Sequence, residues 1–170
     1  MVTSLFKEKI QKIKMVATDI DGVWTDSKIY YSEKGEIMKS FSTYDGYATQ
    51  FLREQGLVVV IMTGEDSPIV ARRAEKLKLE HVFLGESEKL KRLNYLCTKL
   101  KIRLDEVAFI GDDLNDLEVL QAVGLSAMPP NSPILHLFTP DIITKRSGGD
   151  GAFREFSDII LRNRSTHSDE

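Results

Sequence analysis

Short apolar segments alternate with helix-forming segments along most of this chain, and this alternation limits its fold more strongly than any other feature. Continuous apolar runs of four to eight residues are typical of parallel strands that are covered on both faces. The alternation therefore predicts an α/β fold with a doubly wound, mainly parallel sheet. The predicted strands are Met15–Ile20, Leu57–Met62, His81–Leu84, Val107–Ile110, Leu125–Met128 and Ile142–Thr144.

The segments between these runs carry helix signals. One helix, marked by Tyr44 and Leu52, is expected to stop at Gly56. Ser67-Pro68 supplies an N-cap followed by proline at the first helical position, and Ser132-Pro133 predicts another helix in the same way. Further helices are predicted over Ser87–Leu100, Asp113–Val123 and a C-terminal segment that contains Phe153, Phe156, Ile159 and Ile160.

One insertion interrupts the alternation. Ile29–Tyr31 and Ile37–Phe41 flank Ser32–Glu36, whose Glu-Lys-Gly tip predicts a β-hairpin within about residues 26–42. This insertion is shorter than the roughly 40 residues that a unit needs for its own core. We therefore expect a single domain over residues 1–170, ending in a glycine-rich tail, 146–170, whose last residues Ser165–Glu170 are frayed.

Composition excludes several classes of function. The chain has 23 Lys and Arg against 26 Asp and Glu, a net charge of −3, which does not favour a nucleic-acid partner. The single cysteine, Cys97, rules out an intramolecular disulfide and is predicted to be buried on a helix. Met1–Lys14 lacks the apolar run of a secretory signal, and no segment has the length of a membrane span. We expect a cytoplasmic protein with no membrane partner.

Carboxylates follow the predicted strands where those strands end. Asp19 and Asp21 lie two apart before Gly22, and Gly111–Asp116 brings further acids after a later strand, while Thr63-Gly64 follows a third. A single Asp-Gly pair could be only a solvated turn. Several acids at one sheet edge would repel one another unless a divalent cation neutralised them, and ligands that are all oxygen favour Mg²⁺.

These segments, together with Lys89, resemble the four ordered motifs of the haloacid dehalogenase (HAD) superfamily. The resemblance implies a Rossmann-like core in which Asp19 is the nucleophile and Asp21 the general acid/base. It also implies Mg²⁺ bound by the Asp19 carboxylate, the Asp21 backbone carbonyl and Asp112, with Asp116 and Asp113 supporting the metal site. The reaction would be Mg²⁺-dependent phosphomonoester hydrolysis through an aspartyl-phosphate.

The same resemblance assigns phosphate binding to Thr63, Gly64 and Lys89. Taken alone, Lys89 could be a solvated lysine near the start of its helix. Asp113 could likewise be only the helix N-cap.

Neither position at which this superfamily inserts a cap domain has room for one here. The whole chain resembles the capless branch that includes the 3-deoxy-D-manno-octulosonate (KDO) 8-phosphate phosphatases and the nonulosonate 9-phosphate phosphatases. That branch implies a homotetramer joined through the hairpins, in which the glycine-rich tail of one subunit completes a neighbour's site. Gly148 and Gly149 would then bind substrate, although a flexible turn is the simpler interpretation of these glycines.

The resemblance favours a nonulosonate (KDN or sialic acid) 9-phosphate as substrate, because Glu65 stands where the octulosonate enzymes usually have arginine and Trp24 follows the first motif. Lys76 and Arg72 would also contact substrate, although Glu65 could be a helix-start acid, Lys76 a surface lysine and Arg72 a surface salt-bridge partner. The first alternative is a KDO 8-phosphate phosphatase of lipopolysaccharide precursor synthesis. A second is a non-catalytic oligomerisation module of a sugar-nucleotide synthetase, and a third, phosphomutase, generally needs a cap.

Overall fold

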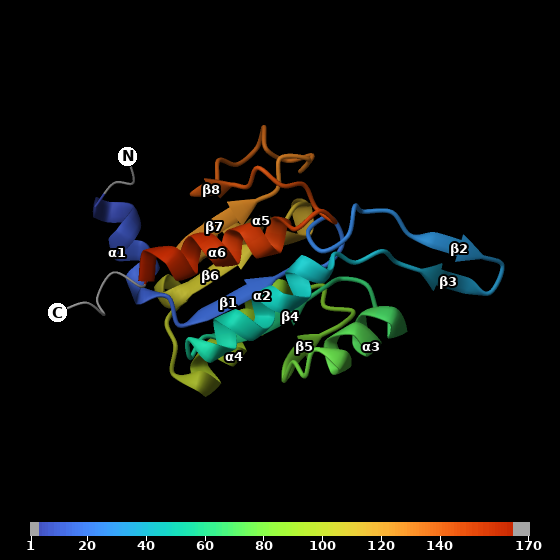
Figure 1. Cartoon of the computed structure of the whole chain (residues 1–170), viewed down its shortest axis with the longest axis horizontal. Helices are drawn as coiled ribbons and strands as arrows, with labels where there is room; N and C mark the ends of the chain where they lie inside the picture. The colour runs from blue at the N-terminus through green and yellow to red at the C-terminus, as the bar shows by residue number, and fades with distance from the viewer. Residues whose placement is uncertain (1–3, 165–170) are drawn as a thin grey trace.

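The computed structural model describes residues 4–164, and within that range a six-stranded sheet forms the centre of the protein (Figure 1). Every neighbouring pair of its strands is parallel, and their order is β5-β4-β1-β6-β7-β8. The strands are β1 Met15–Thr18, β4 Val58–Met62, β5 His81–Phe83, β6 Val107–Ile110, β7 Leu125–Met128 and β8 Ile142–Ile143. The α-helices are α1 Ser4–Lys12, α2 Thr43–Glu54, α3 Pro68–Lys76, α4 Lys89–Leu100, α5 Leu117–Ala122 and α6 Ala152–Arg164.

Strand β1 lies inside the sheet, with β4 on one side and β6 on the other. The chain adds strands on one side of β1 as far as β5, and then adds β6, β7 and β8 on the other side. This is the strand order of a Rossmann-like sheet, in which ligands bind outside the carboxyl ends of the strands where the order reverses. The predicted doubly wound sheet is confirmed, and the residues that follow β1 and β6 lie at its ligand-binding edge.

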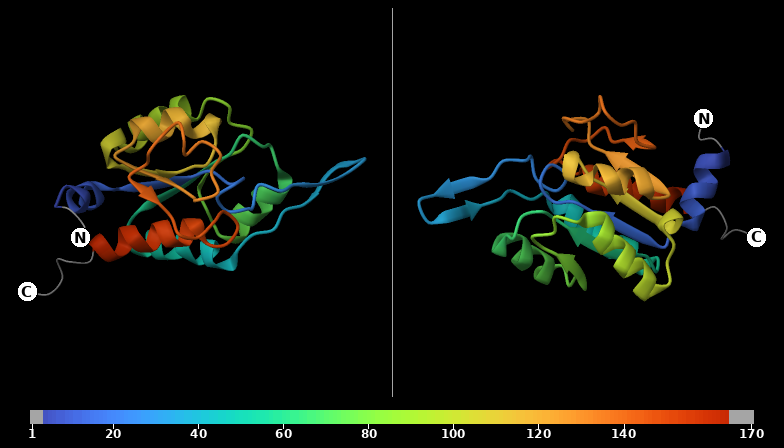
Figure 2. Two further views of the ribbon diagram at one scale, coloured as in Figure 1. Left: turned by 90° about the horizontal axis from the view of Figure 1, so that it is seen from above. Right: turned by 180° about the vertical axis from the view of Figure 1, so that it is seen from behind.

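Helices cover both faces of the sheet (Figure 2). Successive side chains of a strand point to opposite faces, so Val59 and Ile61 of β4 join one apolar cluster while Val60 and Met62 join the other. The first cluster includes side chains of α1, α2, α3 and α6, and the second includes side chains of α4 and α5. Cys97 is buried in the second cluster, as predicted.

The predicted hairpin is a separate two-stranded antiparallel sheet of β2 Tyr30–Ser32 and β3 Gly35–Met38. It extends away from the body of the protein as an arm (Figure 1). Tyr31 is 62% exposed and Ile37 59% exposed, and Tyr30 and Met38 are also exposed. A hairpin of two strands with no covering layer is at best marginally stable in water. The arm therefore leaves apolar surface that is unfavourable in an isolated subunit.

Two helix predictions need correction. No helix follows Ser132-Pro133, because this segment closes a single turn in which the Ile134 carbonyl accepts from the amides of Leu137 and Phe138, and Pro140 follows. The helix predicted over Asp113–Val123 instead begins with a 3-10 turn, η2 Leu114–Asp116, and continues as α5. Another 3-10 turn, η1 Leu104–Glu106, precedes β6.

The predicted frayed end, Ser165–Glu170, lies outside the described residues. Within residues 4–164, no helix combines the length and the apolar character that a membrane crossing requires.

Candidate active site

The acids predicted at the strand ends converge beyond β1 and β6. The Asp19 amide donates to the Ile110 carbonyl at 3.0 Å, which continues the β1–β6 pairing and fixes the backbone of Asp19 at the sheet edge. Carboxylate oxygens of Asp19, Asp112 and Asp116 lie within 4.8 Å of one another, and all three residues are buried. Such a group of buried acids is unstable unless positive charge is brought to it.

Lys89 supplies part of that charge. Its Nζ lies 2.6 Å from Asp116 Oδ1 and 3.0 Å from Asp19 Oδ1, and its side chain is buried. Burial lowers the pKa of Lys89, but Asp19 and Asp116 outweigh that effect and hold the pKa above its ordinary value. The alternative of a solvated lysine is therefore wrong, because this cation is enclosed among the acids.

Gly22 is required by close packing against one of these acids. Its φ is +88°, and a Cβ built on it would lie 1.8 Å from Asp112 Oδ2. The loop after β1 can therefore approach Asp112 only because residue 22 has no side chain. The Ser132 hydroxyl donates to the Asp112 backbone carbonyl at 2.5 Å, which fixes Asp112 from the other side.

Asp116 is held by its own loop. Its Oδ2 accepts from the amides of Asp112 at 3.0 Å and Asp113 at 3.4 Å, while Oδ1 accepts from Lys89. Both oxygens are thus already engaged, which suits an orienting role better than direct binding of a cation. Asp113 caps the 3-10 turn, since its side chain accepts from the Leu114 amide at 2.7 Å.

The electrostatic state of the cluster indicates that cationic charge is insufficient. Burial, followed by Asp116, raises the pKa of Asp19 well above its ordinary value, and Lys89 offsets this only in part. Burial, followed by Asp116 and Asp113, raises the pKa of Asp112 to about 7. Asp19 Oδ1 is buried and, within the described part of the chain, its close polar neighbour is the Lys89 ammonium at 3.0 Å, which does not complete a hydrogen bond to it. An oxygen-coordinated divalent cation fits these residues.

A cavity of about 250 Å³ opens in front of the acids. Thr63 and Gly64, which follow β4, line it together with Asp112, and Glu65 lines it as well. The structure thus brings two of the predicted phosphate-binding residues, Thr63 and Gly64, to the same cavity as the nucleophile candidate, whereas Lys89 is buried against Asp19 and Asp116. Its lining residues are Asp19, Asp21, Ser27, Thr63, Gly64, Glu65, Asp112, Asp113 and Asn115.

Lys39 is a site residue that sequence reasoning missed. It comes from the base of the arm, just after β3, and its Nζ lies 2.8 Å from both carboxylate oxygens of Asp21. The sequence shows only that Lys39 follows the predicted hairpin. Nothing in the local sequence indicates a partner 18 positions earlier. The structure therefore adds a second cation to the site.

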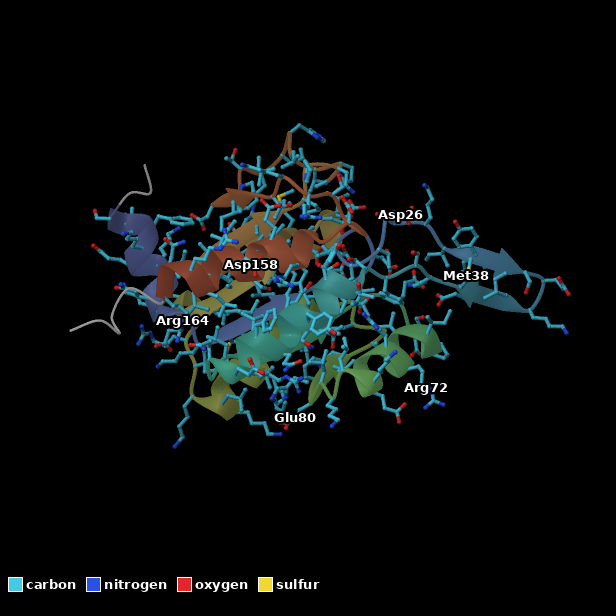
Figure 3. All side chains as sticks on the ribbon, viewed as in Figure 1. Asp26, Met38, Arg72, Glu80, Asp158 and Arg164 are labelled. Carbon is cyan, nitrogen blue, oxygen red and sulfur yellow. The ribbon has the colours of Figure 1, made fainter. Side chains whose placement is uncertain are left out.

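The remaining predicted substrate-binding residues lie outside the cavity that holds Asp19. Arg72 is exposed on α3, where it pairs with Glu75 at 2.6 Å, and Figure 3 shows it on the outer part of that helix. With Lys76 it borders a separate depression that also includes Lys39 and Phe41. A contact with substrate at these two positions stays a prediction.

The tail glycines pack against the loop that follows β1 in the same chain. A Cβ on Gly148 would lie 1.9 Å from the Gly22 carbonyl oxygen, and the Gly149 amide donates to the Val23 carbonyl at 3.2 Å. The Gly148 amide also donates to Asn131 at 2.9 Å. These contacts account for both glycines within one subunit, and their predicted contact with a neighbour's substrate stays untested.

Comparison with known proteins supports the geometry. Residues 36–124 match the family of haloacid dehalogenase-like hydrolases. The chain is 37% identical over 162 residues to the KDO 8-phosphate phosphatase of Haemophilus influenzae, covering 95% of this chain and 90% of that protein. It is 36% identical over 153 residues to the enzyme of that name from Escherichia coli K12, covering 90% and 81%.

Solved structures agree with this relationship. The crystal structure of KDO 8-phosphate phosphatase from Moraxella catarrhalis, in complex with magnesium, phosphate and KDO, superimposes with a TM-score of 0.88 at 37% identity over 93% of this chain and 91% of that one. The cobalt-bound enzyme from Haemophilus influenzae superimposes with a TM-score of 0.87 at 38% identity, over 92% and 91%.

Proposed function

The chain belongs to the haloacid dehalogenase-like hydrolases, and from that premise we propose that it removes phosphate from a phosphorylated 3-deoxy-2-ulosonic sugar acid through an aspartyl-phosphate on Asp19. The observation that carries this proposal is that Asp19 and Asp112 meet at one cavity, with the buried Lys89 ammonium 3.0 Å from Asp19 Oδ1. The intact set of acids argues against a non-catalytic assembly module, which would not need them.

We assign the divalent cation as Mg²⁺. The carboxylates of Asp19 and Asp112 would hold it together with the Asp21 carbonyl, and Asp116 would orient Lys89 and the Asp112 loop. When bound, the cation reduces the repulsion between a carboxylate and a phosphate dianion. Two observations support this assignment: Asp19 Oδ1 is buried without a completed hydrogen bond among the described residues, and the pKa of Asp112 is raised.

The residues of the chain then divide the reaction into two steps. In the first, a carboxylate oxygen of Asp19 forms a bond to phosphorus while the phosphorus–oxygen bond to the sugar breaks, and Asp21 gives its proton to the leaving alkoxide. In the second, Asp21 takes a proton from water as the water oxygen attacks phosphorus and Asp19 is released. Thr63, the Gly64 amide and Lys89 would bind the remaining phosphoryl oxygens; Thr63 and Gly64 line the cavity, and Lys89 lies against Asp19.

Among substrates, the relatives support KDO 8-phosphate better than the nine-carbon acid that the sequence favoured. The proteins from Haemophilus influenzae, Escherichia coli and Moraxella catarrhalis are all named for the eight-carbon substrate. Trp24 gives no support to the nine-carbon acid, because its side chain is fully buried and stacks on Phe153 with ring centroids 5.0 Å apart. We therefore propose KDO 8-phosphate as the preferred substrate.

A nonulosonate 9-phosphate is the second candidate, and one observation favours it. Glu65 lines the cavity that contains Asp19, in the position where the octulosonate enzymes usually carry an arginine. An acidic side chain there cannot pair with a substrate carboxylate as arginine would. The choice between the two substrates therefore depends on what Glu65 contacts in the complex.

Steady-state kinetics with both substrates tests this choice. We expect kcat/KM to be at least about tenfold higher for KDO 8-phosphate than for an N-acylneuraminate 9-phosphate, a difference of about 1.4 kcal/mol. The reverse order would make the nine-carbon acid the substrate, and Glu65→Arg should then shift the ratio toward KDO 8-phosphate.

In Asp19→Asn, we expect neither turnover nor labelling of the protein by radioactive phosphate. Substantial turnover by that variant would remove the proposed mechanism.

We also propose that four copies associate through the arms. The exposed apolar side chains Tyr31 and Ile37 on an unsupported hairpin support an interface there. Sedimentation of the wild type and of a Tyr31→Ser, Ile37→Ser double variant tests this, because only the wild type should sediment as a tetramer. A fully active wild-type monomer at micromolar concentration would contradict it.

A further inference from the structure

Lys39, like Lys89, is a buried lysine, and its side chain is 0% exposed. A buried ammonium is costly unless it is paired, and here the pairing is with a carboxylate of the active site. Its Nζ lies 2.8 Å from each oxygen of Asp21, whose own side chain is 20% exposed. The only other side-chain donor to Asp21 in the described residues is the Thr25 hydroxyl, at 3.4 Å.

The ammonium has a second acidic neighbour. Glu36 Oε2 lies 3.7 Å from Lys39 Nζ, and Glu36 Oε1 accepts from the Ser67 hydroxyl at 2.5 Å. Ser67 is the N-cap of α3 and accepts from the Val70 amide at 3.4 Å. Lys39 therefore links the base of the arm, where it lies, to the loop after β1. Through Glu36 it is also linked to the start of α3.

We propose that Lys39 is a positioning residue that holds the Asp21 carboxylate at the edge of the cavity, where it can exchange a proton with the leaving alkoxide and with water. This inference rests on the proposed function, in which Asp21 is the general acid/base. Proton transfer by a placed side chain contributes about 10²- to 10⁴-fold to the rate, and displacement by about 1 Å can cost about 10²-fold. A side chain with one weak remaining contact would lose much of that contribution.

Two other roles for Lys39 make different predictions. A purely structural lysine would affect all substrates alike, because its loss would disturb the whole cavity. A ligand of the substrate carboxylate would change KM for the sugar acid whether or not Asp21 is present. A residue that positions Asp21 affects only the steps in which Asp21 transfers a proton. Its loss should therefore slow the release of a leaving group that needs protonation, and should hardly affect one that leaves as an anion.

The test compares kcat/KM for KDO 8-phosphate and for p-nitrophenyl phosphate in Lys39→Met and Lys39→Arg. The value of kcat/KM reports the steps up to departure of the leaving group, and nitrophenolate leaves without help from an acid. For Lys39→Met we expect a fall of about thirtyfold or more with KDO 8-phosphate and less than about threefold with p-nitrophenyl phosphate. Lys39→Arg should recover part of the loss, and Lys99→Met, at an exposed position of α4 away from the arm, should behave as wild type.

A double-variant cycle completes the experiment. In an Asp21→Asn background, Lys39→Met should change kcat/KM for KDO 8-phosphate by less than about twofold, because the residue through which Lys39 acts is gone. Equal losses on both substrates, or a full additional loss in the Asp21→Asn background, would overturn the positioning role while leaving the phosphatase intact. Retained activity on p-nitrophenyl phosphate shows that the variant is folded. A wild type inactive on both substrates would overturn the proposed function and this inference with it.

Discussion

Replacing Asp45 by asparagine should stabilise this protein, and more so as the pH rises. Asp45 lies in the first turn of α2 and is fully buried. Its Oδ1 accepts from the Arg154 amide in the first turn of α6 at 2.8 Å, while its Oδ2 is buried with no hydrogen-bond partner among residues 4–164. Asparagine can keep the first contact and carries no charge.

The size of the effect follows from the pKa of Asp45. Burial raises it from 3.8 to about 7, against the opposing effects of the Arg154 amide and of Arg73 and Arg146. A raised pKa means that the native state holds its proton longer than the unfolded state, so the free energy of unfolding falls as the pH rises from about 4 to about 7. The whole pKa shift lowers the free energy of unfolding by about 4 kcal/mol, and about 2.5 kcal/mol of this loss occurs between pH 5 and pH 8.

Urea unfolding at pH 5 and pH 8 measures this difference. The wild type loses stability for several reasons across this range, but those shared by both proteins cancel when the variant is compared with the wild type. We expect the stability advantage of Asp45→Asn over the wild type to be about 2.5 kcal/mol larger at pH 8 than at pH 5. Glu80→Gln, at an exposed acid (Figure 3), serves as the control and should show no such gain. A variant whose advantage is equal at both pH values would refute the reasoning.

Three further predictions concern the acid cluster. Gly22→Ala should lower kcat by more than about 100-fold in a protein that still folds, because the new Cβ would displace the Asp112 carboxylate; circular dichroism and turnover together check this. Saturating Mg²⁺ should raise the melting temperature of the wild type by several degrees and leave that of Asp112→Asn nearly unchanged, which thermal unfolding with and without chelator measures. Ser132→Ala should cost about 1 kcal/mol of stability and weaken Mg²⁺ binding in a titration, because the Asp112 carbonyl loses its hydroxyl donor. Unchanged Mg²⁺ affinity in that variant would contradict the support assigned to Ser132.

The centre of the sheet could be predicted from the sequence because strands β1, β6 and β7 are buried along their whole length. Val107–Ile110 and Leu125–Met128 were predicted with the bounds that the structure has. A strand of this kind is a continuous apolar run bounded by polar residues, so its first and last residues can be predicted from the local sequence. The helix predicted after Ser132 failed because the Ser-Pro signal is equally compatible with a single turn, and here the hydroxyl also bonds to Asp112.

The acids of the site were predictable for the same reason, since they follow strands β1 and β6 directly. The groups that hold them were harder to find. Lys89 was identified only by resemblance to a family motif, and Lys39 was not identified, because its partner Asp21 lies 18 positions away and the contact depends on how the arm folds back. Local patterns fix which residues reach the sheet edge, whereas their partners are set by tertiary packing.

The loop after β1 is held by contacts from two different segments, and this would allow a site without a cap to keep Asp21, its proposed acid/base residue, in place. On one side, Gly148 and Gly149 pack so closely against the backbone of the loop that neither position has space for a Cβ. On the other side, the Lys39 ammonium engages both oxygens of Asp21. Catalytic groups that are fixed before substrate arrives need no reorganisation during the reaction. Because Lys39 stands at the base of the arm, an interface formed by the arms would also restrain the second of these contacts, so dissociation of the subunits should weaken proton transfer before it weakens binding of phosphate.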